Sequence, residues 1–475
     1  MAMVHSLSDL IVFENSQGVR ARGNLVKVSR STLIFEVYNP YSIVQLSEVL
    51  HHVEIRSDDR VIYRGRAVVS GLVNTGLMLI VSANPLDAWS ELAGLAGDSQ
   101  TIRGKIADFV ADWQSHQQLQ PDYQLSVSRL RSFLSATNRW LEHLDFYGAD
   151  RAEVATGLND ELFPDLVREL VPPLLNLLQE FEYQASIVDE ESRTTHIRYA
   201  QDDLHPLIMR APFVHRAYHK PLGYAGDYEM VNMMLRDARE GPTVYAQLIN
   251  TLYLKTGPAQ AHRNRIDILV DWLKRRIEGQ RNVEAEQQLR ILNVGCGPAI
   301  EMQRLIRRYR AIEHCDITLV DFSQETLDYT RECLETASQE SGTTPAIRYL
   351  HQSVHGLLKQ ASSQRRSASD TALEPGFDLI YCAGLFDYLS DRVCARLLGL
   401  FHELCVPGGQ VLVTNVHPSN PSRHGMEHLL EWYLVYRDEA GMRKLGRVFK
   451  DYDVFADETG VNVFLTIDKA NEPAR

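Results

Sequence analysis

The sequence predicts an α/β protein, with a parallel-sheet domain at the carboxyl-terminal end that is preceded by a helical region and a small β-barrel. Three changes in pattern along the chain support this division. Short β-branched segments broken by turn residues fill residues 1–88, and apolar residues at helical spacing fill residues 89–280. From residue 281 to residue 475, short apolar strands alternate with helices, which is the pattern of βαβ units.

The composition narrows the class of protein. The 475 residues are 44% hydrophobic and 23% charged, which is ordinary for a soluble globular protein. The net charge of −13 weighs against a nucleic-acid partner, because phosphate contacts need an excess of Lys and Arg. No apolar run approaches the about 18 residues of a transmembrane helix, so we expect no integral membrane segment.

The chain ends and the cysteines indicate a compartment. The first nine residues lack a basic stretch followed by an apolar one, so they do not read as a signal peptide. The six cysteines form no CxxC pair, which argues against a disulfide framework and against a zinc site. We therefore expect a reduced, cytoplasmic protein without a bound metal.

The amino-terminal part is expected to be a small barrel. Its predicted strands are residues 19–28, 33–38, 53–56, 61–69 and 76–83. They are short, rich in β-branched residues and separated by Gly, Asn-Pro and Ser-Asp-Asp turns, as in compact all-β folds.

The middle part is expected to be helical. Four leucines between Leu174 and Leu178 follow Pro172-Pro173, and a proline pair at this point predicts a helix start. One loop, residues 219–228, stands out because it places two glycines and two tyrosines between helices. Such a loop has the backbone freedom and flat side chains of a lid. The alternative is a turn between helices that packs on the sheet.

The third part carries the sharpest motif. A predicted strand at residues 291–294 runs into Gly295-Cys296-Gly297, where the missing side chains let the backbone turn sharply and approach a ligand. A dinucleotide fingerprint would need a third glycine at Ile300, so an NAD site is disfavoured. Asp321 ends the next predicted strand, where its carboxylate could bind both hydroxyls of a ribose. The alternative role for Asp321 is to cap the helix that follows.

Further strands are predicted at residues 317–320, 377–382 and 410–416, with a third strand running into the segment 349–354 and a Pro407-Gly408-Gly409 turn before the last strand. In this order, these pieces resemble class I S-adenosylmethionine-dependent methyltransferases over residues 281–475. The resemblance implies a Rossmann-like fold with S-adenosyl-L-methionine as cofactor. The cofactor residues that it implies are Asn293, Gly295, Gly297, Asp321, Phe322, Gln352, Ser353 and Gly384.

The chain departs from that family at two positions of the glycine loop. Asn293 stands where the family often has an acidic residue, and Ala299 stands where it often has a third glycine. Gln352-Ser353 follows the third strand, where the family commonly has an acidic residue near the adenine. These departures bear on the contacts of the cofactor more than on the fold.

A narrower resemblance covers about residues 200–440. The segments 215–230, 384–389 and 417–423 resemble those of the bacterial 3-hydroxypalmitic acid methyl ester biosynthesis methyltransferases, which make a fatty-ester quorum signal. This resemblance implies carboxyl O-methylation of a 3-hydroxy fatty acid. From the glycines and tyrosines of loop 219–228 we expect a lid that covers the sulfonium of the cofactor. The catalytic candidates are Tyr224, Asp227, Tyr228, His417 and Arg423. Arg423 could bind a carboxylate through two hydrogen bonds, and its alternative is a surface arginine.

The predicted barrel faintly resembles a PilZ domain, a receptor for cyclic di-GMP. The segment Lys27–Thr32 aligns with the family's second motif, with Lys27 in place of its acidic residue and Thr32 in place of its glycine. Arg20 and Arg22 are spaced wrongly for the first motif. The resemblance therefore implies a degenerate domain that has lost nucleotide binding.

The chemistry of the acceptor stays open at this point. A carboxylate acceptor is ionised at neutral pH and needs no general base. A hydroxyl or amine metabolite would need one, and His219, His417 and Asp387 are the candidates. A different class of function is a regulatory ligand-binding protein with a PilZ-like sensor, and a methyltransferase of macromolecules comes third. We expect a small-molecule partner, and a homodimer is left open.

Overall fold

The computed structural model describes residues 10–470 apart from ten gaps, namely 29–31, 38–43, 58–59, 75–78, 88–109, 111–118, 150–151, 191, 282–287 and 364–372. The chain forms two compact units that do not follow its linear order. The barrel–helix unit comprises Met1–Ala225, Arg236–Thr256 and Pro421–Tyr433. The sheet unit comprises Gly226–Leu235, Gly257–Asn420 and Leu434–Arg475.

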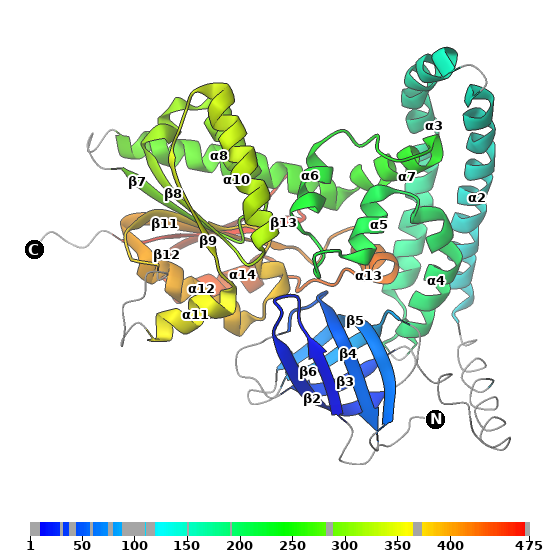
Figure 1. The fold of residues 1–475 in the computed structure, drawn as a ribbon, viewed down its shortest axis with the longest axis horizontal. Coiled ribbons are helices and arrows are strands. Elements are labelled where there is room, and N and C mark those ends of the chain that lie inside the picture. Colours follow the sequence, from blue (N-terminus) through cyan, green and yellow to red (C-terminus); the bar gives the residue numbers. More distant parts are fainter. Residues whose placement is uncertain are drawn as a thin grey trace, which may run out of the picture. The chain divides into compact units, whose positions relative to one another are not determined.

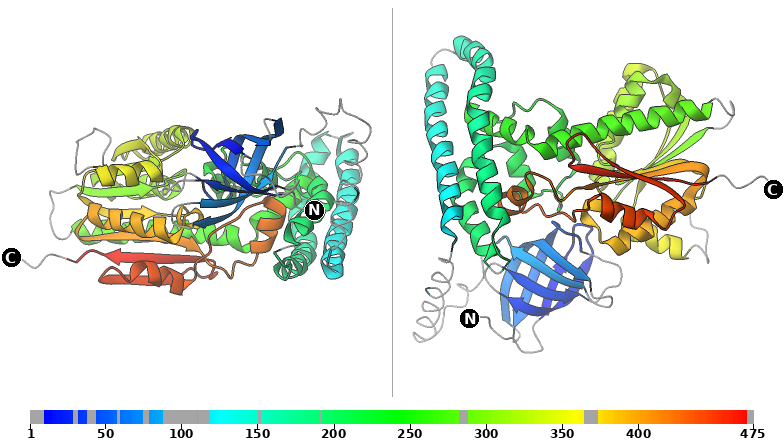
Figure 2. Two further views of the ribbon diagram at one scale, coloured as in Figure 1. Left: turned by 90° about the horizontal axis from the view of Figure 1, so that it is seen from below. Right: turned by 180° about the vertical axis from the view of Figure 1, so that it is seen from behind.

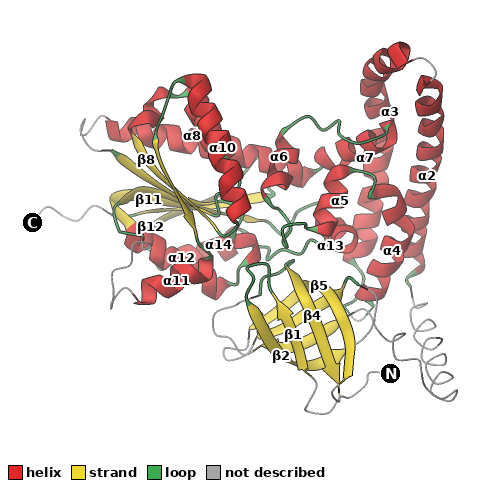
Figure 3. Cartoon of the chain, in the orientation of Figure 1, coloured by secondary structure: helices red, strands yellow, loops and turns green. Residues whose placement is uncertain are grey.

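The barrel–helix unit begins with a closed six-stranded barrel, which confirms the predicted barrel (Figure 3). Its strands are β1 (Leu10–Glu14), β2 (Arg20–Val28), β3 (Leu33–Val37), β4 (Val49–Ser57), β5 (Arg60–Asn74) and β6 (Leu79–Pro85). All neighbouring pairs are antiparallel, in the order β1-β2-β3-β6-β5-β4. Alternate residues of β1, β3 and β6 are buried, so one face of each strand fills the barrel.

The helices of this unit are α2 (Pro121–Ala149), α3 (Ala152–Ser186), α4 (Arg193–Ile208), α5 (Pro212–His219), α7 (Val244–Leu254) and α13 (Arg423–Leu430). The long helices α2 and α3 lie side by side (Figure 1). The helix start predicted at Pro172-Pro173 is wrong, because α3 begins at Ala152 and runs through both prolines. The buried side chains of Phe163, Leu174 and Phe181 anchor the helix on both sides of the prolines.

The sheet unit contains a seven-stranded sheet in the order β12-β13-β11-β10-β7-β8-β9. Its strands are β7 (Leu289–Val294), β8 (Cys315–Asp321), β9 (Ala346–His351), β10 (Phe377–Cys382), β11 (Cys405–Val416), β12 (Asp451–Ala456) and β13 (Asn462–Asp468). Neighbouring strands from β9 to β11 are parallel, whereas β13 pairs antiparallel with both β11 and β12. The right panel of Figure 2 shows β12 and β13, in red, at one edge of the sheet.

Helices cover both faces of this sheet (Figure 1). One group comprises α8 (Gly257–Arg281), α9 (Ile300–Arg308) and α10 (Gln324–Ser341). The other group comprises α11 (Val354–Ser363), α12 (Asp391–Leu404) and α14 (Glu439–Gly446). The unit also contains α6 (Tyr228–Leu235) and the short 3-10 helices η2 (Arg310–His314) and η3 (Phe386–Tyr388).

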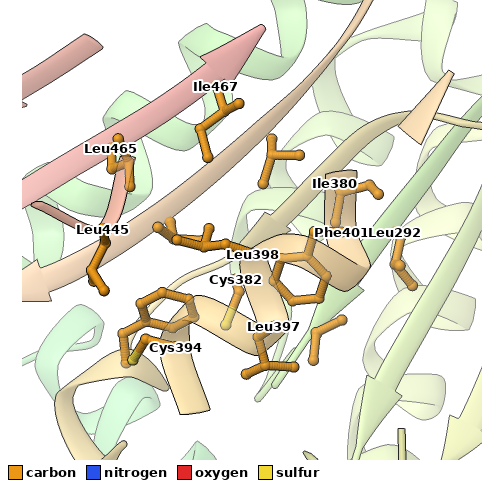
Figure 4. Close-up of a cluster of buried hydrophobic side chains, with 14 of the residues drawn as sticks. Leu292, Ile380, Cys382, Cys394, Leu397, Leu398, Phe401, Leu445, Leu465 and Ile467 are labelled. Atoms are coloured by element: carbon orange, nitrogen blue, oxygen red, sulfur yellow. The ribbon is translucent and has the colours of Figure 1, made fainter. Parts of the chain in front are cut away.

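The core beside α12 shows how the strands and helices hold together. Leu397, Leu398 and Phe401 of α12 are fully buried against Ile380 and Leu465 of the sheet (Figure 4). Buried apolar side chains of this size each stabilise the fold by about 1.5–3 kcal/mol. The strands β7, β8 and β10 are buried on both faces, as expected of a parallel sheet between helix layers. None of the helices in the described part of the chain is long and apolar enough to span a membrane.

Candidate active site

The carboxyl ends of β7 and β8 form the centre of the candidate site. After β7 the backbone takes positive φ at Gly295 (71°), Gly297 (51°) and Ala299 (46°) before α9 begins. The amide of Gly295 donates to the carbonyl oxygen of Val320 over 2.8 Å, which fixes the turn against β8. A Cβ built at Gly297 would meet no atom within 4 Å, so space lies open beside this residue.

Asp321 joins the two strand ends through its carboxylate. Its Oδ2 accepts a hydrogen bond from the Gly297 amide (3.1 Å), and its Oδ1 accepts one from the Ser323 amide (3.0 Å). The residue is only 6% exposed, and burial raises the pKa of its carboxyl group. A carboxylate has about four acceptor positions, and the amides of Gly297, Ser323 and Phe322 leave capacity for a ligand hydroxyl. The helix cap after β8 belongs instead to Ser323, whose hydroxyl accepts from the Thr326 amide.

Asn293 lies beside an acidic group that sequence reasoning missed. Its Nδ2 donates to Oε1 of Glu301 over 3.1 Å, and the same oxygen accepts from the Tyr381 hydroxyl over 2.7 Å. Glu301 lies in the first turn of α9, is buried, and has its carboxyl pKa raised by that burial. Glu301 of α9 thus contributes a carboxylate next to Asn293. The Oδ1 atom of Asn293 is buried without a hydrogen-bond partner among the described residues.

Arg265 of α8 brings a buried positive charge to the same strand ends. Its guanidinium donates to Nδ1 of His262 over 2.8 Å, and a Cβ built at Gly384 would lie 3.1 Å from its Nη1. Burial lowers the pKa of Arg265, and the nearby carboxylates of Asp387 and Glu301 act in the opposite direction. A buried guanidinium of this kind is suited to a carboxylate ligand.

The loop after β10 completes this group. Gly384 has a φ of 95°, and its amide donates to the Thr414 hydroxyl over 3.0 Å. Asp387 accepts from the Val416 amide through Oδ1 over 2.7 Å. Burial raises the pKa of Asp387 to about 6, against the opposing effect of Arg265. The loop therefore holds a buried carboxylate near the guanidinium.

The candidates that follow β8 and β9 lie on adjoining turns. The carbonyl oxygen of Phe322 accepts from His351 over 2.7 Å, if the histidine carries its proton on Nε2. The amide of Gln352 donates to the carbonyl oxygen of Asp321 over 2.8 Å. The hydroxyl of Ser353 accepts from the Gly356 amide over 3.1 Å, at the start of α11. Gln352 and Ser353 thus share the edge of the sheet with Asp321.

The predicted lid residues fall into both units. Tyr224 belongs to the barrel–helix unit, whereas Asp227 and Tyr228 belong to the sheet unit. Asp227 is buried, and its Oδ1 accepts from the amides at the start of α6. The Tyr228 hydroxyl donates to Glu325 over 3.1 Å, and its ring lies 4.5 Å from that of Tyr329. Both contacts are with α10, the helix that follows Asp321.

His417 and Arg423 are likewise divided between the units. The Nδ1 atom of His417 accepts from the Ser419 amide over 3.0 Å, and its Nε2 lies 3.3 Å from Glu439. Arg423 opens α13 and donates from Nε to Glu427 over 3.2 Å. The arginine is therefore paired within its own helix.

Two functional candidates could have been found from weak signals in the sequence. Glu301 is the first acidic residue after the glycine loop, and its carboxylate accepts a hydrogen bond from Asn293. Arg265 ends the polar run His262-Arg263-Asn264 just before an apolar stretch of α8. A charge next to an apolar stretch is uncommon in a core helix. Among the described residues, no group of three or more His, Cys, Asp or Glu side chains could hold a metal ion.

Comparisons with known proteins give only low similarities. No family model matches the chain, and no curated protein matches it. Among solved structures, a possible exported protein from Bordetella parapertussis is similar at 16% identity and a TM-score of 0.41, over 66% of this chain and 97% of that one. Magnesium protoporphyrin IX methyltransferase from Synechocystis PCC 6803, with bound S-adenosylhomocysteine, has 11% identity and a TM-score of 0.32 over 45% of this chain and 84% of its own.

The N-methyltransferase NodS from Bradyrhizobium japonicum is similar at 14% identity and a TM-score of 0.30, over 51% of this chain and 97% of that one. At these identities and TM-scores, the similarities do not carry a function over to this chain.

Proposed function

We propose that this chain is an S-adenosylmethionine-dependent methyltransferase that acts on a small molecule. The observation that carries the proposal is the hydrogen bond from the Gly297 amide to the buried Asp321 carboxylate, with open space beside the glycine. This arrangement leaves acceptor positions for ribose hydroxyls at the carboxyl edge of a parallel sheet, where open α/β folds bind ligands.

The residues present fit the cofactor at both of its ends. Asp321 would bind the ribose, and Gln352 and Ser353 lie on the adjoining turn, where an adenine would lie. Arg265 would bind the carboxylate of the amino-acid part, and Glu301 or the unpartnered Oδ1 of Asn293 would accept from its ammonium group. Both charges of the amino-acid part would thus meet opposite charge or an acceptor.

For the acceptor, we propose the carboxylate of a 3-hydroxy fatty acid in quorum-signal synthesis. When bound, S-adenosylmethionine supplies a methyl group on a positively charged sulfur. A carboxylate acceptor is already ionised, so the protein would align it and exclude water rather than remove a proton. Alignment of this kind contributes up to about 7–11 kcal/mol. Arg423 would bind the acceptor's carboxylate in this proposal.

The lid is part of the proposal. Tyr224, Asp227 and Tyr228 would cover the reacting group, because water solvates a carboxylate and opposes transfer. Tyr224→Ala and Tyr228→Ala are then expected to lower turnover much more than the melting temperature. If the melting temperature falls sharply together with turnover, these tyrosines only stabilise the fold.

The alternatives differ in the acceptor and in the role of the barrel. A hydroxyl or amine acceptor would need a general base. The candidates are His417 and Asp387 of the sheet unit and His219 of the barrel–helix unit. We further propose that the barrel is a degenerate PilZ-like domain. Ser29–Ser31 of its aligned motif lie outside the described residues. A cytoplasmic location, an absence of nucleic-acid partners and a homodimer also remain proposals.

The acceptor is tested by incubating the purified protein with S-adenosylmethionine and 3-hydroxy fatty acids of several lengths. Mass spectrometry should detect the methyl ester, and Asp321→Ala should reduce its formation when S-adenosylmethionine is limiting. Methylation of a hydroxyl or an amine in a cell extract, with the fatty acids untouched, would replace the proposed acceptor. Cofactor binding without any product would favour the regulatory alternative.

A further inference from the structure

Ser47 of the barrel is hydrogen-bonded to the backbone of Tyr433, far along the chain. Ser47 is fully buried just before β4, with a φ of 62°. Its hydroxyl donates to the carbonyl oxygen of Tyr433 over 2.9 Å and accepts from the Tyr433 amide. The Tyr433 ring is buried with Val49 and Val68 of the barrel strands. A non-glycine residue at positive φ costs free energy, so the fold retains this geometry against a local penalty.

The barrel also holds the predicted lid loop near its start. The amide of Val49 donates to the carbonyl oxygen of Gly223 over 2.7 Å. Gly223 has a φ of 83°, and a Cβ built there would lie 2.8 Å from Cβ of Ser16. Lys220 is buried and donates to the carbonyl oxygen of Leu430 over 3.0 Å, which ties the loop to the end of α13. The barrel, residues 220–223 of the loop and segment 430–433 thus form one connected structure within the barrel–helix unit.

The loop that contains Gly223 and the segment that ends at Tyr433 both continue along the chain into the sheet unit. Only Leu434 separates Tyr433 from Val435, whose amide donates to the carbonyl oxygen of Asp387 over 2.7 Å. The Val435 carbonyl oxygen accepts from the Asn415 side chain over 2.8 Å. Residues 434–437 therefore support the loop after β10, which carries Gly384 and Asp387 of the candidate site.

We infer that Ser47 is a positioning residue for the candidate site, which acts through the backbone of Tyr433 and Val435 on the loop at residues 384–388. The inference extends the proposed function, since it gives the barrel a role in the same reaction. The hydroxyl restrains the backbone of Tyr433, and only Leu434 lies between that residue and Val435 in the chain. Loss of the hydroxyl should therefore loosen the hydrogen bonds that Val435 makes to Asp387 and Asn415.

The test uses the full chain with Ser47→Gly and Ser47→Ala. Glycine adopts positive φ readily, so Ser47→Gly removes the hydroxyl without adding backbone strain. Ser82→Ala, on β6 of the same barrel, is the matched control. Hydrogen–deuterium exchange is measured by mass spectrometry in peptides that cover residues 384–389 and 431–437, with a β8 peptide as the internal reference. The affinity for S-adenosylhomocysteine is measured by calorimetry.

In Ser47→Gly we expect the exchange rates of the 384–389 and 431–437 peptides to rise at least about fivefold, while that of the β8 peptide stays unchanged. Fivefold is the lower end of typical coupling factors between two sites. Cofactor affinity should fall by a similar factor. A uniform rise in all peptides would show a merely structural role and overturn the inference, as would an unchanged 384–389 peptide. If the wild type binds no S-adenosylhomocysteine, the proposed function fails, and the exchange measurement still decides the inference.

Discussion

The Gly297 amide and the Asp321 carboxylate are joined by a 3.1 Å hydrogen bond, although 24 residues separate them in the chain. The bond closes the glycine loop of β7 onto the end of β8. It also orients the carboxylate so that its remaining acceptor positions are available beside an open space. The proposed ribose site rests on that one contact.

Asp321→Ala should weaken the binding of S-adenosylmethionine and S-adenosylhomocysteine by about 1.5–3 kcal/mol, the scale of a hydrogen bond to a charged group. Isothermal titration calorimetry measures the loss. The control is Asp316→Ala, which removes a partly exposed carboxylate at the other end of β8, 3.7 Å from Arg290. Equal affinity in the wild type and Asp321→Ala would remove Asp321 from the ribose site.

Arg265→Gln should lower the affinity for S-adenosylhomocysteine at least about tenfold, because a charge-assisted contact with the amino-acid carboxylate is lost. Adenosine, which has no carboxylate, should bind the wild type and the variant alike. Arg304→Gln, which breaks a surface pair with Asp267, is the control and should change neither affinity. A parallel loss for adenosine would mean that Arg265 only supports the fold.

Gly297→Ala should lose cofactor binding while the fold is retained. The added methyl group meets no protein atom, but it enters the space in which we place the ligand. Gly460→Ala is a matched control, because Gly460 also has positive φ (68°) and open surroundings, in the loop between β12 and β13. Each variant should lose about 1–2 kcal/mol of stability from backbone strain. If both variants bind the cofactor as the wild type does, the space beside Gly297 is not the site.

Sequence patterns were sufficient for the local structure around this site. The predicted strand at residues 291–294 lies within β7, and the one at 317–320 lies within β8, because buried parallel strands are short continuous apolar runs. The positions of Arg265 and Glu301 beside these strand ends had only weak signals in the sequence, since they depend on packing among α8, α9 and β10. The helix start at Pro172 failed because tertiary burial of α3 outweighed the local effect of proline. The hairpin of β12 and β13 carried no motif and was missed.

Burial in the barrel predicts a pH dependence of stability. Glu48 is buried, and desolvation raises its pKa from 4.5 to about 7, despite hydrogen bonds from Ser16 and Gln45. The folded state binds the proton of the Glu48 carboxyl group more tightly than the unfolded state does. The stability that this proton contributes is therefore fully present below about pH 4.5. It is lost as the pH rises through about 7 and amounts to about 3 kcal/mol.

Urea unfolding at about pH 5 and about pH 7.5 measures this contribution. The free energy of unfolding of Glu48→Gln relative to the wild type should rise between the two pH values, because only the wild type loses the contribution of Glu48. Glu36→Gln on β3 serves as the control and should keep the pH dependence of the wild type. A Glu48→Gln variant with an unchanged pH dependence would show that Glu48 is ionised in the folded protein at both values.

The most direct test of the central claim is a calorimetric titration of the folded, full-length wild type with S-adenosylhomocysteine, with NAD as the comparison ligand. We predict saturable binding of S-adenosylhomocysteine that Gly297→Ala abolishes and Gly460→Ala retains, and no binding of NAD. The absence of S-adenosylhomocysteine binding up to about 1 mM, where the binding free energy falls to about 4 kcal/mol, would contradict the assignment of this chain as a methyltransferase.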